Sequence, residues 1–237
     1  AVYGNRRDGY SSEGDKLRPS NFYSASKASA DLIALTHFKV NGLPVIIARS
    51  ANNYGKYQSL ENFIASSITN LIDGKKIQLM LASENSGFNL RDWINVRDNC
   101  RAIWLTSQNG ADGEIYNIPG DDEQTNLAMA RILLKEFNLG EEWIEEIANK
   151  NGPCLRDSTD GWKLKRLGFE YVHKNLGIGL AQTIKWYKEN ENWWRPLKDV
   201  CPSIEDNPSS EKQQQKIAIN SHRREDLLVR KGFIDLL

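Results

Sequence analysis

Apolar residues recur at helical spacing in several stretches of the 237-residue chain, and short apolar runs separate these stretches. The first helical stretch carries apolar residues at positions 28, 32, 35 and 38, after a polar start at Asn21 and before Gly42. This spacing predicts a helix over residues 22–41. The apolar run Val45–Ala48 follows Pro44 and predicts a buried strand. A helix, a tight turn and a buried strand together predict one αβ unit of a doubly wound sheet.

The same criteria predict a series of further elements. Helices are expected at residues 60–73, 97–107, 125–137 and 176–186, strands at 77–81, 91–96 and 114–118, and one or two helical turns at 141–148. Residues 5–21, 82–89 and 149–161 are expected to be irregular. Beyond Leu197 the composition becomes polar, so we expect a linker at 198–216, followed by a short amphipathic helix within 217–237.

The overall charge excludes some classes of partner. The chain has 31 basic and 31 acidic side chains, so its net charge of zero argues against binding to nucleic acid or to an anionic membrane. Its three cysteines lie far apart, which argues against a zinc site or a disulfide framework and fits a reducing, cytoplasmic location. We find no apolar run long enough to span a bilayer and no signal peptide.

The stretch Tyr23-Ser24-Ala25-Ser26-Lys27 opens the first predicted helix. Positions four apart share one helix face, so the phenol and the ammonium point the same way. An ammonium beside a phenol favours the phenolate, which makes Tyr23 a candidate acid/base near neutral pH. A chance Tyr-x-x-x-Lys is the alternative, because the chain contains eight tyrosines and many lysines.

A second candidate site follows the predicted strand at residues 45–48. The strand leads into Ser50-Ala51-Asn52-Asn53-Tyr54-Gly55. Ligands of open α/β sheets bind at the carboxyl ends of the strands, so this loop is a candidate binding site. Side-chain amides can both donate and accept hydrogen bonds. A loop-forming pair of asparagines is the structural alternative.

The first residues, Ala1-Val2-Tyr3-Gly4, have the pattern of a strand end that runs into a loop. We therefore expect the chain to be the C-terminal part of a longer protein. No Gly-x-Gly-x-x-Gly motif that could cradle a dinucleotide is visible, and Gly177-Ile178-Gly179 lacks a preceding strand.

The order of the motifs over residues 1–197 resembles the extended short-chain dehydrogenase/reductase family. Within that family the resemblance is greatest to the nucleotide-sugar 4,6-dehydratases of the dTDP-glucose type. The motifs are Tyr23-x-x-x-Lys27, Asn52-Asn53-Tyr54-Gly55, Arg91-Asp92-Trp93, Tyr116-Asn117-Ile118 and Trp186-Tyr187 with Trp193-Trp194-Arg195-Pro196-Leu197.

The resemblance implies an α/β fold. Residues 1–58 would be the C-terminal remnant of a Rossmann-like NAD-binding domain. Residues 59–197 would form mainly the smaller mixed α/β domain that binds the nucleotide sugar, with some elements returning to the Rossmann domain. Residues 198–237 would be a linker and tail. The Gly-rich NAD-binding half would lie upstream, so we expect the chain alone to be inactive.

The resemblance also implies a reaction and its residues. Tyr23 would take the proton of the sugar 4-hydroxyl while a hydride passes to NAD, and Lys27 would hold the nicotinamide ribose. Loss of water across C5–C6 and return of the hydride would complete the turnover. Asn53 would contact the cofactor and Asn52 the substrate, a nucleotide-diphosphate sugar.

Three further residues are implied to bind the substrate. Arg91 would grip the diphosphate, because a planar guanidinium suits bidentate phosphate contacts. Asn117 would be a second substrate-binding asparagine, and Arg156 would supply a basic group near the nucleotide. The alternatives are an ion pair of Arg91 with Asp92 or Asp98, and a strand-end turn at Asn117. The aromatic cluster from Trp186 to Trp194 is expected to serve packing, and the resemblance allows a homodimer.

The sequence departs from the dehydratase pattern at four places. The family carries Thr-Asp-Glu before Val-Tyr-Gly, where this chain has Ala1. The family's Glu-Lys-Leu is Glu61-Asn62-Phe63, residues 81–88 replace a shorter hairpin, and residues 151–155 replace Arg-Pro-Gly-His-Asp. These departures keep two alternatives open: a nucleotide-sugar epimerase or decarboxylase of the same family, or a non-catalytic remnant.

Overall fold

The computed structural model describes residues 2–6, 8–81, 90–120, 122–148 and 156–200. The chain divides into two compact units, residues 1–191 and 192–237, and the elements below belong to the first unit unless stated otherwise.

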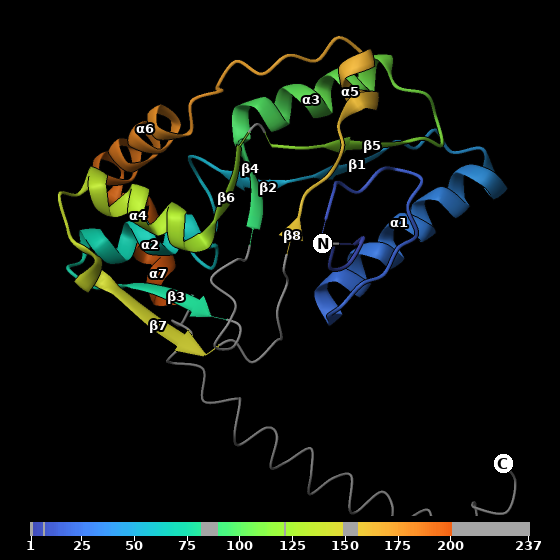
Figure 1. The fold of residues 1–237 in the computed structure, drawn as a ribbon. Coiled ribbons are helices and arrows are strands. Elements are labelled where there is room, and N and C mark those ends of the chain that lie inside the picture. The colour runs from blue at the N-terminus through green and yellow to red at the C-terminus, as the bar shows by residue number, and fades with distance from the viewer. Residues whose placement is uncertain (1, 7, 82–89, 121, 149–155, 201–237) are drawn as a thin grey trace, which may run out of the picture. The chain divides into compact units, whose positions relative to one another are not determined.

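The first layer is a parallel pair of strands between two helices. β1 (Ile47–Ser50) pairs with β5 (Ile115–Ile118) in the register Ile47 to Ile115. Figure 1 shows α1 (Phe22–Asn41) and α3 (Val96–Asn109) on opposite faces of this pair. The short helix α5 (Trp162–Arg166) packs against β5. This arrangement is an αβ unit with a parallel sheet, and it confirms the predicted α/β class.

The second sheet begins one residue after β1. β2 (Asn52–Tyr54), β4 (Leu90–Asn95) and β6 (Asp122–Thr125) form a path on which β4 also pairs with β8 (Arg156–Asp157). β2 and β8 run parallel to β4, whereas β6 runs antiparallel. Since Ala51 alone separates β1 from β2, the Asn52-Asn53 pair lies where the chain passes from one sheet to the next (Figure 1).

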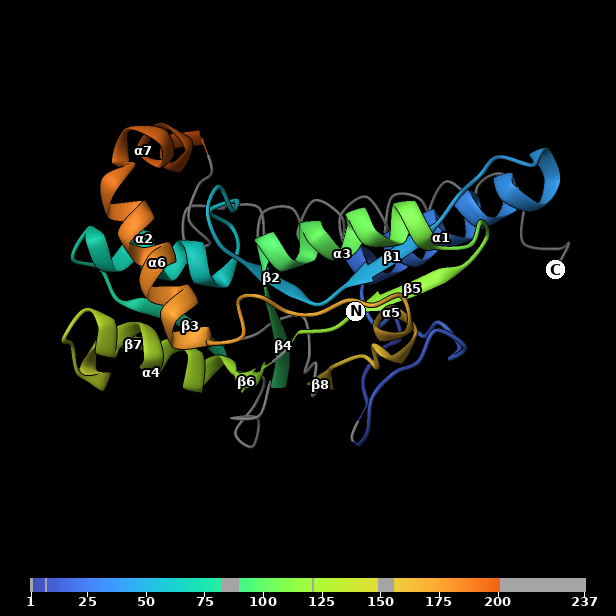
Figure 2. The same ribbon diagram turned by 90° about the horizontal axis from the view of Figure 1, so that it is seen from above.

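The third group combines two strands with three helices. β3 (Ile77–Leu81) pairs in parallel with β7 (Ile144–Ala148), and α2 (Phe63–Ile72), α4 (Asn126–Glu136) and α6 (Leu176–Glu189) pack with them. The core of this group contains the fully or nearly fully buried residues Ile64, Ile68, Leu79, Met129, Leu133 and Leu180. Figure 2 shows β2 and β4 between this group and the β1–β5 pair.

Side-chain caps fix the starts of helices α1 and α4. Asn21 accepts a hydrogen bond from the Ser24 N–H at 2.8 Å, and Thr125 accepts one from the Ala128 N–H at 3.0 Å. Asparagine and threonine are both common at such caps, because their side-chain oxygens can accept a free N–H of the first helical turn. Helix α1 ends at Gly42 with a left-handed φ of 65°, a conformation that glycine adopts without strain.

Several sequence predictions were wrong in type or position. Residues 141–148 form a 3₁₀ turn (Glu141–Trp143) and strand β7, because residues 144–148 pair with β3. β1 starts at Ile47, and Ala48 is exposed, so the run at 45–48 is not buried throughout. Within 149–161, Arg156 and Asp157 pair as β8. Residues 198–200 belong to α7 (Glu191–Val200), which lies mostly in the second unit and is not part of a linker.

The predictions for residues 82–89, 149–155 and 201–237 lie outside the described residues. In the described ranges, none of the helices has the length and apolar character needed to cross a bilayer. Over the same ranges, no three His, Cys, Asp or Glu side chains are grouped as a metal ion would require.

Candidate functional site

A cavity of about 660 Å³ lies beside the carboxyl ends of β1 and β2 in the first unit. It is bounded by α1, the segment from Ala48 to Asn53, the start of α2, β4, and the segment after β8. Its volume falls in the range of small-molecule and cofactor sites. The predicted site residues that line it are Tyr23, Lys27, Asn52, Asn53 and Arg91. The structure thus brings together residues that lie up to 68 positions apart in the sequence.

Tyr23 and Lys27 occupy the first turns of α1 on one face of the helix. The Lys27 Nζ lies 5.7 Å from the centroid of the Tyr23 ring. The Tyr23 side chain is 65% exposed, so a ligand in the cavity can reach its hydroxyl. This geometry confirms that the two side chains share one face of the helix.

A chain of hydrogen bonds fastens α1 to the sheet. The Arg49 Nε donates to Asp31 at 2.8 Å, and the Arg49 Nη1 donates to the Tyr3 hydroxyl at 2.7 Å. Tyr3 in turn donates to the Asn117 Oδ1 at 2.6 Å. Burial raises the pKa of Tyr3, although its bonds to Arg49 and Asn117 oppose that shift. Asp31 lies one turn beyond Lys27, so the network holds the helix face that carries Tyr23 and Lys27.

The two asparagines have defined side-chain orientations. The Asn52 Nδ2 donates to the Asp92 carbonyl at 3.3 Å, and the Asn53 Nδ2 donates to the Ala51 carbonyl at 3.1 Å. A flipped amide would place oxygen against oxygen, so in each case the amide oxygen points away from these carbonyls. The Asn53 Oδ1 is buried and has no hydrogen-bond partner among the described residues.

Arg91 lies on β4 between two neighbouring strands. It is opposite Gln124 of β6 and Asp157 of β8 in the registers of the sheet, and its Nη1 donates to the Leu90 carbonyl at 3.2 Å. The two carboxylates considered as its alternative partners have other contacts. Asp92 accepts the Gly120 N–H at 2.7 Å, and Asp98 pairs with Arg101 at 2.9 Å. Arg91 also lines the cavity.

Asn117 and Arg156 do not line the cavity. Asn117 is 0% exposed, accepts the Tyr3 hydroxyl and donates its Nδ2 to the Ser11 carbonyl at 3.1 Å. It joins the N-terminal loop to β5. Arg156 forms a bidentate pair with Glu123 at 2.9 and 2.7 Å, and this hydrogen bonding raises the pKa of the guanidinium. Substrate binding by either residue stays a prediction.

The cavity also contains residues that sequence reasoning missed. Gln58, Trp93, Asn126 and Thr159 line it, and each has a buried polar atom without a hydrogen-bond partner in the part of the chain that the structure describes. Buried polar groups are normally paired, so unpaired ones around a cavity indicate a ligand. Two of these residues could have been found from the sequence, because Trp93 lies in the Arg91-Asp92-Trp93 motif and Asn126 lies at the start of the helix predicted at 125–137. Gln58 and Thr159 gave none.

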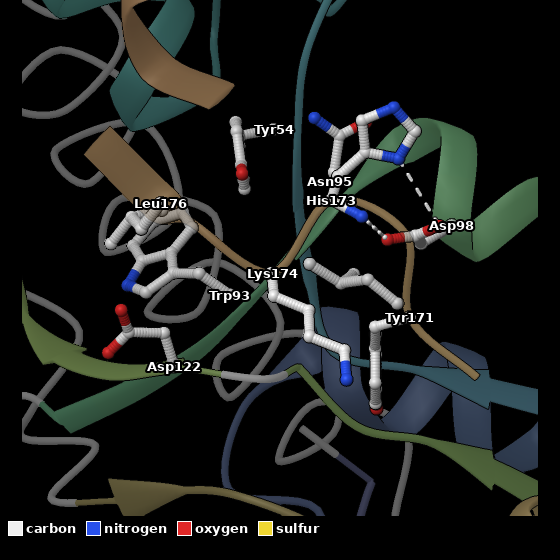
Figure 3. A pocket seen from close by; sticks show the side chains of 10 residues that line it. Tyr54, Trp93, Asn95, Asp98, Asp122, Tyr171, His173, Lys174 and Leu176 are labelled. Atoms are coloured by element: carbon white, nitrogen blue, oxygen red, sulfur yellow. Dashed lines mark hydrogen bonds and ion pairs between the residues drawn. The ribbon is translucent and has the colours of Figure 1, made fainter. Parts of the chain in front are cut away.

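A second hollow, of about 10 Å³, lies next to Asp98 (Figure 3). It has room for about one water molecule, so it is too small for a substrate. The Asp98 side chain is 1% exposed and accepts the His173 N–H at 2.8 Å and the Val172 N–H at 3.2 Å. This carboxylate fastens the segment before α6 to the start of α3.

Comparison with known proteins identifies relatives of the chain. Residues 1–119 match the NAD dependent epimerase/dehydratase family. A dTDP-glucose 4,6-dehydratase from Streptomyces antibioticus is 37% identical over 198 residues, which is 83% of this chain and 58% of that protein. The chain therefore spans little more than half the length of the relatives it matches.

Two solved structures also resemble the chain. A dTDP-glucose 4,6-dehydratase from Streptomyces venezuelae, with NAD and thymidine diphosphate bound, is 41% identical, with a TM-score of 0.78 over 83% of this chain and 60% of that one. A Thermus thermophilus UDP-glucose 4-epimerase in complex with NAD is 20% identical, with a TM-score of 0.73 over 80% of this chain and 61% of that one, and shows the fold alone. The family model matches half of the chain, and the Tyr23–Lys27 pair lines the cavity. The chain therefore belongs to the NAD dependent epimerase/dehydratase family.

Proposed function

We propose that the chain carries the acid/base pair and most of the substrate site of an NAD-dependent dTDP-glucose 4,6-dehydratase. The observation that carries this proposal is the convergence of Tyr23, Lys27, Asn52, Asn53 and Arg91 on one cavity. On sequence, residues 1–58 would belong to the NAD-binding domain and 59–197 mainly to the substrate domain. Cytoplasmic location and assembly as a homodimer are further parts of the proposal.

The residues present fit the nicotinamide end of NAD. The buried, unpaired Asn53 Oδ1 suits a carboxamide N–H, and the Lys27 ammonium suits ribose hydroxyls, so Lys27 and Asn53 would hold this end. When bound, NAD supplies the hydride acceptor and donor that the reaction needs.

Tyr23 would take the proton from the sugar 4-hydroxyl. The exposed Tyr23 lines the cavity, and the Lys27 Nζ lies 5.7 Å from the centroid of its ring. The network through Asp31 and Arg49 holds α1, so the distance between phenol and ligand is set by the fold. The same tyrosine can return the proton in the reverse direction.

Arg91 and the amides would bind the nucleotide sugar. The Arg91 guanidinium suits a diphosphate, and its position on β4, where that strand pairs with β6 and β8, makes it a rigid support. The Asn52 side chain and the unpaired Asn126 Oδ1 suit sugar or ribose hydroxyls. In the family, the carboxyl pair that performs the elimination stands directly before Val-Tyr-Gly, and this chain has Ala1 at the position of the Glu.

Binding of dTDP-glucose to the purified chain tests this proposal. Calorimetry should detect a complex, and Arg91→Ala should weaken it by about 10- to 100-fold, because hydrogen bonds to a charged group are among the stronger ones. Arg131→Ala is the matched control, since Arg131 is exposed and pairs with Glu141 outside the cavity. Absence of binding, or equal affinities of the two variants, would contradict the proposal and favour a non-catalytic remnant.

A further inference from the structure

The loop that joins β2 to α2 is held in a constrained conformation. Gly55 has a φ of 147°, and a Cβ there would lie 2.5 Å from the Val96 Cγ1. Tyr57 has a φ of 61°, which is unusual for a bulky residue. Such backbone conformations persist only where the surrounding structure enforces them, and they gather at functional sites.

Two aromatic residues of α6 enforce this conformation. The Tyr57 ring packs edge-on against Trp186, with 4.5 Å between ring centroids. The Tyr187 hydroxyl donates to the Gln58 carbonyl at 3.1 Å. Burial raises the pKa of Tyr187 to about 12, so this hydroxyl stays a hydrogen-bond donor over the whole physiological range. The loop therefore presents the residue after Tyr57 in a fixed position.

That residue is Gln58, whose side chain lines the large cavity. Its Nε2 donates to the Asn53 carbonyl at 2.7 Å, which fixes the orientation of the amide. Its Oε1 is buried and lacks a hydrogen-bond partner in the described ranges. The Asn53 Oδ1 is a second unpaired acceptor, and Asn126 and Thr159 contribute further unpaired oxygens to the cavity lining. The wall thus offers two amide oxygens, five residues apart and joined through one hydrogen bond.

We propose that Gln58 is a ligand-binding residue whose side-chain oxygen accepts a hydrogen bond from an uncharged O–H or N–H group of the bound molecule. An amide oxygen accepts and does not donate, so an anionic phosphate oxygen would leave it unpaired. Its complement is a neutral donor, either a hexose hydroxyl or the carboxamide of a nicotinamide. This inference rests on the proposed function and adds a binding residue outside the motifs.

Two pairs of probes distinguish the sources of the donor. The pair dTDP-glucose and dTDP differs by the hexose. The pair nicotinamide mononucleotide and nicotinic acid mononucleotide differs by the carboxamide. Titrations of the purified chain would use calorimetry for the first pair and NMR shifts for the second. Gln58→Met removes the acceptor at nearly constant volume, and Gln108→Met on the exposed face of α3 is the matched control.

Gln58→Met should weaken the binding of the donor-bearing member of one pair by about 3- to 10-fold, as expected for the loss of one neutral hydrogen bond. The binding of the other member of that pair should weaken by less than about 2-fold. The pair that responds identifies the source. A residue that only supports the loop would weaken both members of each pair equally, and that result would overturn the inference. Thermal unfolding of both variants reports any loss of folding.

The inference and the proposed function fail in different ways. If the unmodified chain binds none of the four probes, the proposed function fails and the inference falls with it. If the chain binds them and Gln58→Met leaves both affinity ratios unchanged, only the inference is overturned. Gln58→Ala gives a second variant, because it also removes the acceptor oxygen. It should lose the preference for the donor-bearing probe as Gln58→Met does.

Discussion

At the scale of single residues, helix geometry and one capping bond place the reactive pair. Asn21 fixes the start of α1, and the four-residue spacing then puts Tyr23 and Lys27 on the same side. The ion pair of Asp31 with Arg49 orients that side toward the cavity. The phenol is thus positioned by contacts that lie outside the motif itself.

This arrangement makes Tyr23 the residue on which oxidation should depend most. In a full-length protein that contains this chain, Tyr23→Phe should keep the fold and NAD binding. It should slow substrate-dependent NAD reduction by about 10²–10⁴-fold, which is the usual contribution of general acid–base catalysis. Absorbance at 340 nm in a single turnover measures the step. Reduction at the unmodified rate would rule out this role for Tyr23.

Asp98 gives a prediction about stability and pH. Burial by itself would raise the pKa of the Asp98 carboxyl, but hydrogen bonds from His173, Arg101 and Val172 outweigh it and lower the pKa. A carboxyl with a lowered pKa stabilises the fold above its unfolded value of about 3.9, and this contribution is lost as the pH falls through the folded pKa. Acid should therefore weaken the junction between α3 and the segment before α6.

Asp98→Asn should lower the free energy of unfolding by about 2–4 kcal/mol at pH 7, because it removes the charge from a buried hydrogen-bonded network. The difference from the unmodified chain should begin to shrink as the pH falls below the unfolded pKa of about 3.9. It should be lost once the pH passes the lowered folded pKa, where the aspartate is itself protonated. Urea unfolding followed by tryptophan fluorescence measures both quantities. The exposed Asp112→Asn is the control, and an equal effect of the two changes would contradict the assigned role.

At the scale of elements, α6 is held against β2 by a close approach at one glycine. A Cβ on Gly179 would lie 2.3 Å from the Tyr54 hydroxyl oxygen. A Cβ on Gly177, in the same helix, would meet nothing nearer than the Asn175 Oδ1 at 3.4 Å. The segment Gly177-Ile178-Gly179 therefore lies within helix α6, which packs on Tyr54 through Gly179, and it is not a phosphate loop.

Alanine substitutions at these two positions test the packing. Gly179→Ala should destabilise the chain by about 1–3 kcal/mol, because the added methyl group forces the helix away from Tyr54. Gly177→Ala should be neutral or should stabilise the chain by up to about 1 kcal/mol, since alanine favours helix and has room there. Thermal melts compare the two variants. The opposite order would show that α6 does not approach β2 at Gly179.

At the scale of the whole molecule, the proposed site lies in a chain that is shorter than its relatives. It covers 58% of the Streptomyces antibioticus protein, and its sequence contains no Gly-x-Gly-x-x-Gly loop. Dinucleotide pyrophosphates are bound by such a loop at a helix N-terminus. Under the proposed function, the cavity would contact the nicotinamide end of NAD and the sugar nucleotide, and this sequence would supply no such loop for the pyrophosphate.

The purified chain by itself should show no conversion of dTDP-glucose in the presence of NAD. The physical reason is that weak binding of the nicotinamide end alone cannot hold the cofactor in the geometry that hydride transfer needs. Mass spectrometry of the sugar nucleotide after prolonged incubation measures the product. Detectable 4-keto-6-deoxy sugar, absent with Tyr23→Phe, would show that the chain turns over unaided.

The sequence by itself determined the elements that depend on local spacing and the residues that belong to motifs. The helical periodicity of 22–41, the caps Asn21 and Thr125, and the strand 77–81 follow from neighbouring residues, so they were predictable. The tertiary structure decided what depends on distant partners. The segment 144–148 became a strand because β3 pairs with it, and Asn117 turned inward because Tyr3 and Ser11 bond its amide. Gln58 and Thr159 entered the site only through the folding of separate segments around one cavity, which no local pattern records.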